Sequence, residues 1–211
     1  MRPYFLSFLL TAILIVLLPG PDTMVVVKNI IRGGKKGGLL AGLGVLVGLM
    51  IWVAAASFGV SEILAASRYG YMALRVCGAI YLTWMGISTI RSRRKDIEGI
   101  DEKYSIGGAK DRAGHLKRSF SDGLMSDLLN PKIGIFFITF LPSFVPSGYQ
   151  IGTTTALLGI VFTILTAIYF SILIAISMKL TKWMSKGSIR SRLSIGTGLV
   201  LIGFAIRLAT E

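Results

Sequence analysis

The chain has 211 residues, of which 53% are hydrophobic and only 16% are charged, and its mean hydropathy is +0.71. A soluble domain carries roughly 25% charged residues, so this composition excludes an ordinary soluble globular protein and indicates an integral membrane protein. The formal net charge of +13 would suggest a nucleic-acid partner for a soluble chain, but here the basic residues lie between the apolar stretches and indicate membrane topology.

Six apolar stretches follow one another along the chain, and each is long enough for a transmembrane helix of about 20 residues. We therefore predict an all-α integral membrane protein with six transmembrane helices. The stretches are 4–31, 39–60, 70–90, 120–146, 151–178 and 193–209, and the first and fourth are interrupted.

The first stretch is interrupted by the sequence PGPD at residues 19–22. Proline is favoured at the first position of a helix because it has no amide hydrogen to satisfy. We expect Pro19 and Gly20 to form the break and Pro21 to start a new half-helix, with Asp22 and Thr23 in its first turn. The free amides of that turn would lie near the middle of the bilayer.

Most of the 23 lysines and arginines fall between the first and second, the third and fourth, and the fifth and sixth stretches. Basic loops stay on the cytoplasmic side, so we expect a multi-pass protein of the plasma or inner membrane with both termini outside. Anionic lipid headgroups are the expected partners of these loops, and no nucleic acid is needed to explain them.

Residues 91–119 are the one long polar segment, and we interpret them as a cytoplasmic linker between two halves, 1–90 and 120–211. His115 and Cys77 are each the single residue of their type. The sequence therefore predicts no metal site, no redox pair and no cofactor.

The fourth stretch repeats the pattern of the first, because Asn130, Pro131 and Lys132 interrupt it near its middle. Each half then has three spans and opens with a broken one, so the second half enters the membrane from the opposite side. This is the pattern of an inverted-topology repeat, and such a pair of breaks indicates the binding site of a transporter. The alternative is that both breaks are simple kinks.

Three ionisable residues, Asp22, Asp127 and Lys132, lie within the broken spans. Such residues are functional candidates by default. We expect the two half-helix N-termini and Lys132 to bind a carboxylate, and Asp22, with or without Asp127, to bind an amino group or the coupling proton. The alternative for Asp127 is a carboxylate that faces the cytoplasmic vestibule.

The motifs PGPD, GGKKGGLLAGLGVLVGL (33–49), RVCGAIYLTWMG (75–86), GLMSDLLNPKIGIFFITFLPSFV (123–145) and GLVLIGFAIRL (198–208) resemble the LysE/RhtB family of amino-acid exporters. The resemblance covers nearly the whole chain except the linker. It implies efflux of amino acids, typically coupled to the proton gradient. One departure is Asp127, which stands where members of the family often have asparagine.

The sequence as a whole predicts a secondary transporter, not an enzyme, that exports a small amino acid or related zwitterionic metabolite by proton antiport. An exporter of a metal cation is the first alternative, although Lys132 would repel the ion and no Cys/His cluster is present. A non-transporting accessory membrane protein is the second alternative. The oligomeric state, a homodimer included, is left open.

Overall fold

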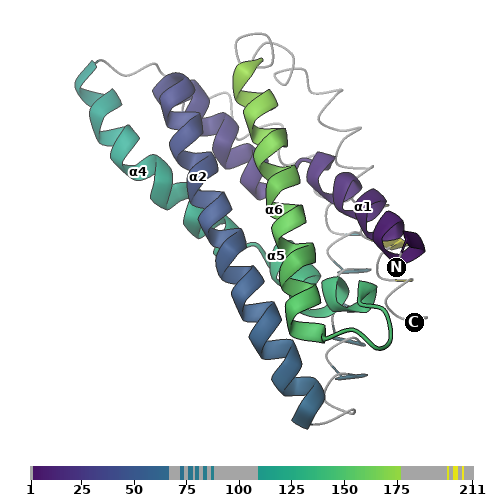
Figure 1. The fold of residues 1–211 in the computed structure, drawn as a ribbon. Coiled ribbons are helices and arrows are strands. Elements are labelled where there is room, and N and C mark those ends of the chain that lie inside the picture. The colour runs from purple at the N-terminus through teal and green to yellow at the C-terminus, as the bar shows by residue number, and fades with distance from the viewer. Residues whose placement is uncertain are drawn as a thin grey trace.

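The computed structural model describes residues 2–66, 72–73, 76–77, 79–80, 83–84, 87, 109–176, 199, 202–203 and 206. Every regular element among these residues is a helix, as the sequence predicts. The helices lie side by side as a bundle (Figure 1).

The N-terminal elements are α1 (Arg2–Leu17) and α2 (Pro21–Ala66). The chain turns within α2 at Gly34, whose φ of 65° and ψ of −159° are not helical. A positive φ is readily adopted by glycine because it has no Cβ. After the turn, Gly37 lies against the main-chain oxygen of Asn29. The element therefore consists of two antiparallel helical parts, residues 21–33 and 35–66.

The second half of the described chain contains α4 (Ala109–Leu128), α5 (Pro131–Ile135), η2 (Phe136–Phe140), η3 (Leu141–Phe144) and α6 (Ile151–Ala175). The η2 segment is a π-helix and η3 is a 3₁₀-helix, so the winding changes twice after the second break. The α4 helix starts at Ala109, and the last residues of the expected linker are therefore helical.

Within the part of the chain that the structure describes, two helical segments are long and apolar enough to cross a membrane: Pro21–Gly59, which includes the turn at Gly34, and Ile151–Ala175. A third span is formed if the pair Arg118–Leu128 and Pro131–Phe144, bent by 48°, counts as one. The expected interruption of the fourth apolar stretch is thus present. The described residues between 72 and 87 are helical, but most of the stretches 70–90 and 193–209 lies outside the described residues. The six-span inverted repeat stays a prediction.

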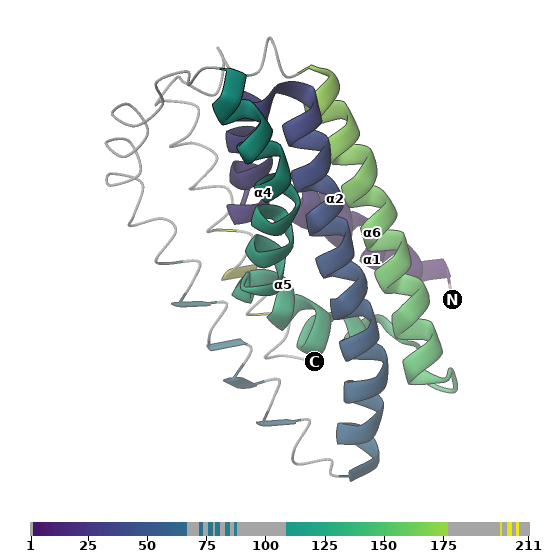
Figure 2. The same cartoon turned by 90° about the vertical axis from the view of Figure 1, so that its left-hand side faces the viewer.

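The second part of α2 runs between α4 and α6, and α1 crosses obliquely beside α6 (Figure 2). The most extensive packing is between α2 and α4. It is close because Gly44 lies against the main-chain oxygen of Phe120, and Gly123 lies against that of Ala41, with no room for a Cβ at either glycine. Small residues allow two helix backbones to approach in this way.

An aromatic cluster joins α1, the π- and 3₁₀-helical segments and α6. The ring of Phe8 lies 5.6 Å from that of Phe144, which lies 5.1 Å from Phe140. On the other side of the cluster the rings of Phe136 and Phe162 are 5.0 Å apart. Each of these five side chains is at most 3% exposed, so this cluster belongs to the buried apolar core.

Candidate functional site

The two breaks of the chain lie together in the structure, and one carboxylate joins them. Asp22, in the first turn of α2, accepts a hydrogen bond of 2.7 Å from the Asn130 side-chain nitrogen at Oδ2. Its Oδ1 accepts a second bond of 2.7 Å from the hydroxyl of Ser126 on α4. Asp22 is 8% exposed. Segments more than 100 residues apart in sequence are thus connected through one buried side chain.

Each break starts a new helix at its proline, as the sequence predicts. α2 begins at Pro21, and the Gly20 carbonyl accepts the Met24 amide at 3.1 Å. α5 begins at Pro131, with Asn130 as its N-cap. The exposed ring of Pro131 and the partly buried ring of Pro19 bound the breaks, and neither lines the cavity described below.

The first-turn amides of α5 already have partners. The Lys132 amide donates to Asn130 Oδ1 at 3.1 Å, and the amides of Ile133 and Gly134 both donate to the Asn130 carbonyl at 3.1 Å. In an ideal helix the corresponding amides of α2, those of Asp22 and Thr23, have no intrahelical acceptor. That the helix ends at the breaks bind an anion stays a prediction.

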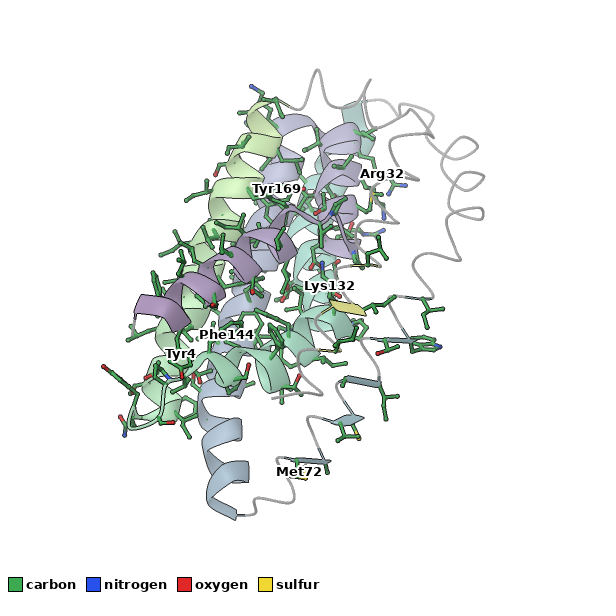
Figure 3. The ribbon with its side chains drawn as sticks, turned by 90° about the vertical axis from the view of Figure 1, so that its right-hand side faces the viewer. Tyr4, Arg32, Met72, Lys132, Phe144 and Tyr169 are labelled. Atoms are coloured by element: carbon green, nitrogen blue, oxygen red, sulfur yellow. The ribbon has the colours of Figure 1, made fainter. Side chains whose placement is uncertain are left out.

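The Lys132 side chain crosses from the second break towards the first. It is 8% exposed, and a Cβ placed on Gly20 would lie 2.8 Å from its Nζ. Figure 3 shows Lys132 beside the inner end of α1. Among the described residues no direct ion pair joins Lys132 to Asp22, whose two oxygens are bonded to Asn130 and Ser126. The glycine leaves the space that the ammonium group occupies.

Asp127 lies on α4, one turn before the second break, and is 0% exposed. Neither carboxylate oxygen has a hydrogen-bond partner among the described residues. A Cβ on Gly48 of α2 would lie 2.5 Å from Oδ2, so the carboxylate rests on the α2 backbone. The Trp52 indole donates to the main-chain oxygen of Asp127 at 3.3 Å, not to its side chain.

A cavity of about 30 Å³ lies between these groups, which is room for about two water molecules. Asp22, Thr23, Asp127 and Lys132 all line it, together with Gly20 at the first break. Its other walls are mainly apolar and are supplied by Ile15, Val16, Leu18, Val45, Leu49, Ile133, Phe162 and Phe170.

Two polar residues of the cavity were not predicted from the sequence. Thr166 and Tyr169 on α6 line it together with Lys132, and both Tyr169 and Lys132 are labelled in Figure 3. Thr166 and Tyr169 are three residues apart and so share one helix face, which was the available signal. Asp122, by contrast, does not line the cavity and contacts the Asn29 amide at 3.5 Å.

Comparisons with known proteins identify a family and several relatives of this chain. A family model described as "LysE type translocator" matches residues 13–211. An uncharacterized membrane protein of Bacillus subtilis (strain 168) is 32% identical over 206 residues, with 96% of each chain covered.

Two relatives carry the name "Leucine efflux protein". The protein from Enterobacter sp. (strain 638) is 32% identical and covers 98% of this chain and 95% of its own. The Klebsiella pneumoniae protein is 31% identical, with 98% and 94% covered. No solved structure matches the chain.

Proposed function

The chain belongs to the LysE type translocator family, and we propose that this membrane transporter exports a small amino acid or a related zwitterionic metabolite in exchange for protons. The family membership confirms the resemblance noted in the sequence. The names of the leucine efflux relatives support an amino acid as the exported molecule. We further propose six spans in two inverted repeats, in the plasma or inner membrane, with both termini outside.

The observation that carries this proposal is the charge pattern of the cavity between the breaks. A zwitterion has one carboxylate and one ammonium group, and the cavity has Lys132 together with the carboxylates of Asp22 and Asp127. Buried charges inside a membrane are unfavourable unless they are paired. A zwitterionic substrate offers both signs of charge to this set of groups, whereas a metal cation would be repelled by Lys132.

The carboxylate of the substrate binds Lys132 at the N-terminus of α2. The ammonium group of Lys132 lies beside Gly20, the residue that precedes the first residue of α2. Positive charge and a helix N-terminus both stabilise an anion at this point. The amino group of the substrate then faces the carboxylate side of the cavity.

An amino acid is larger than the cavity, so transport requires its walls to separate. Side chains of α1 (Ile15 and Val16) and of α6 (Thr166 and Tyr169) form part of its walls in the described conformation. Exchange of the substrate with either side of the membrane then needs α1 and α6 to move relative to the α2–α4 pair. Access that alternates between the two sides converts proton entry into substrate exit.

The test is efflux from proteoliposomes that hold the purified protein and are loaded in turn with radiolabelled L-amino acids, starting with L-leucine. An imposed inward proton gradient is expected to accelerate the efflux of at least one of them. If no amino acid leaves faster than from protein-free liposomes, the proposed function is wrong. If efflux occurs at the same rate with and without the proton gradient, the proposed proton coupling is wrong.

Lys132→Met is the informative variant, with Lys36→Met as the matched control. Hydrogen bonds to charged groups contribute about 1.5–3 kcal/mol, which corresponds to a loss of roughly tenfold to hundredfold in substrate affinity for Lys132→Met. Lys36 is exposed beside the turn at Gly34, and its substitution should leave efflux unchanged. Equal efflux by the Lys132→Met and Lys36→Met variants would show that Lys132 does not bind the substrate.

A further inference from the structure

The two carboxylates of the cavity differ in their hydrogen bonding. Both oxygens of Asp22 are occupied, by Asn130 and by Ser126, each at 2.7 Å. Asp127 is 0% exposed, and neither of its oxygens has a partner in the described part of the chain. Hydrogen bonds therefore hold the Asp22 carboxylate in place, whereas the Asp127 carboxylate is available to bind a proton or a cation.

The groups that face Asp127 do not take up its carboxylate. The second part of α2 presents Val45, Gly48 and Leu49, which have no polar side chain, and the Trp52 indole binds the main-chain oxygen of Asp127. The described titratable groups around the cavity are Asp22 on the first part of α2, Lys132 on α5 and Tyr169 on α6, and none of them is bonded to Asp127 Oδ1 or Oδ2.

A buried carboxylate without a partner is strongly unfavourable while it is charged. It becomes favourable when it binds a proton or when a cation with hydrogen-bond donors lies against it. The ammonium group of an amino acid is such a cation, and it binds the charged carboxylate much more strongly than the protonated carboxyl group. Binding of the ammonium group therefore favours release of the proton.

We propose that Asp127 is the exchanging residue of the transporter, which holds a proton when the cavity is empty and releases it when the substrate's ammonium group binds. Asp22 keeps its bonds to Asn130 and Ser126 throughout and is a positioning residue that joins the two breaks. The inference rests on the proposed function. It deepens that function because competition at one carboxylate gives an exchange of one proton for one amino acid.

The test is a binding experiment on the purified protein in detergent. Calorimetric titrations of L-leucine, in buffers of different ionisation enthalpy and at several pH values, give both the affinity and the number of protons released. If another amino acid gives faster efflux, it replaces leucine. The companion probe is the α-hydroxy analogue (2-hydroxy-4-methylpentanoate for leucine), which keeps the carboxylate and lacks the ammonium group.

Wild-type protein is expected to release about one proton per bound amino acid at acidic pH, and its affinity should rise by up to roughly tenfold per pH unit there. The hydroxy acid should release none. In Asp127→Asn, the affinity for the amino acid should fall by at least tenfold and lose this pH dependence, while the hydroxy acid binds as before. Asp122→Asn, on the same helix but outside the cavity, should behave as wild type.

If Asp127→Asn still releases a proton on binding, or if its affinity for the amino acid still depends on pH, Asp127 is not the exchanging residue. If Asp127→Asn binds neither probe, the wild-type proton count decides. Release with the amino acid alone supports the proposal, and equal release with both probes, or none with either, overturns it. Failure of the wild-type protein to bind or transport any amino acid would instead count against the proposed function itself.

Discussion

Asn130 joins the two breaks with both ends of its side-chain amide. Its oxygen caps α5 by accepting the Lys132 amide at 3.1 Å, and its nitrogen donates to Asp22 Oδ2 at 2.7 Å. In Asn130→Asp the cap is kept, since aspartate is as good an N-cap as asparagine. The donor towards Asp22 is lost, however, and two carboxylates face each other. This substitution therefore isolates the link between the breaks.

The expected cost of Asn130→Asp follows from that geometry. A hydrogen bond to a charged group contributes about 1.5–3 kcal/mol, and the buried acceptor is left without this partner. Repulsion between two carboxylates adds to this loss, and we expect a total of about 3–5 kcal/mol. Asp22→Asn alone should cost only about 1 kcal/mol, because the new amide can accept from Asn130 and donate to Ser126, whose hydroxyl turns.

The double variant Asp22→Asn/Asn130→Asp restores every hydrogen bond in exchanged roles. The amide now at position 22 would donate to the carboxylate now at position 130 and accept from Ser126. That carboxylate would still accept the Lys132 amide and cap α5. We therefore expect the double variant to lie within about 1 kcal/mol of wild type, so that the coupling energy between the two positions is about 3–5 kcal/mol.

Unfolding of the four proteins in the same detergent measures this coupling, with the unfolding midpoints compared under identical lipid and salt. Substrate binding to the double variant provides a second readout, because a recovered site should also recover affinity. Losses that simply add, or an Asn130→Asp protein as stable as wild type, would refute the link between the breaks.

Two further predictions concern packing and topology. Gly44→Ala should destabilise the protein by at least about 1–3 kcal/mol, because its Cβ has no room beside α4, whereas Gly59→Ala, with nothing within 4 Å, should not lower the unfolding midpoint. Single cysteines at Gly148 and Gly108, in a Cys77→Ala background, should react with membrane-impermeant maleimide from outside and from inside respectively. Labelling of the Gly108 position from outside would show that the protein has the opposite orientation in the membrane.

The starts of the two half-helices could be predicted from the sequence because their cause is local. Proline lacks an amide hydrogen and fixes φ, so Pro21 and Pro131 fit the first helical position whatever surrounds them. The placement of Asp22, Asp127 and Lys132 in one cavity was expected from the matched breaks. The partners of Asp22 were not predicted, because Asn130 and Ser126 are neutral and lie more than 100 residues away in the sequence.

Other features depend on tertiary packing and left little trace in the sequence. The spacing of Thr166 and Tyr169 places them on one face of α6, but several other hydroxyl residues of this helix, such as Thr163 and Ser171, obscure that signal. The change from π- to 3₁₀-helix across residues 136–144 has one local signal, Pro142, and otherwise follows from packing of the aromatic rings. Glycines in α2 allow another helix to approach closely, but their spacing does not identify α4 as the partner.

The turn at Gly34 has a mechanical consequence. A single residue connects the two parts of α2, and consecutive Cα atoms are only about 3.8 Å apart, so this joint cannot lengthen. The α2 start at the first break and the segment that carries Gly48 therefore act as two arms of one short hinge. Between η3 and α6 the chain instead has residues 145–150, including Gly148 with a φ of 88°. These six residues allow a wider range of distances between their ends than the single residue at Gly34 does, so we expect α6 to move more easily relative to η3 than the two parts of α2 relative to each other.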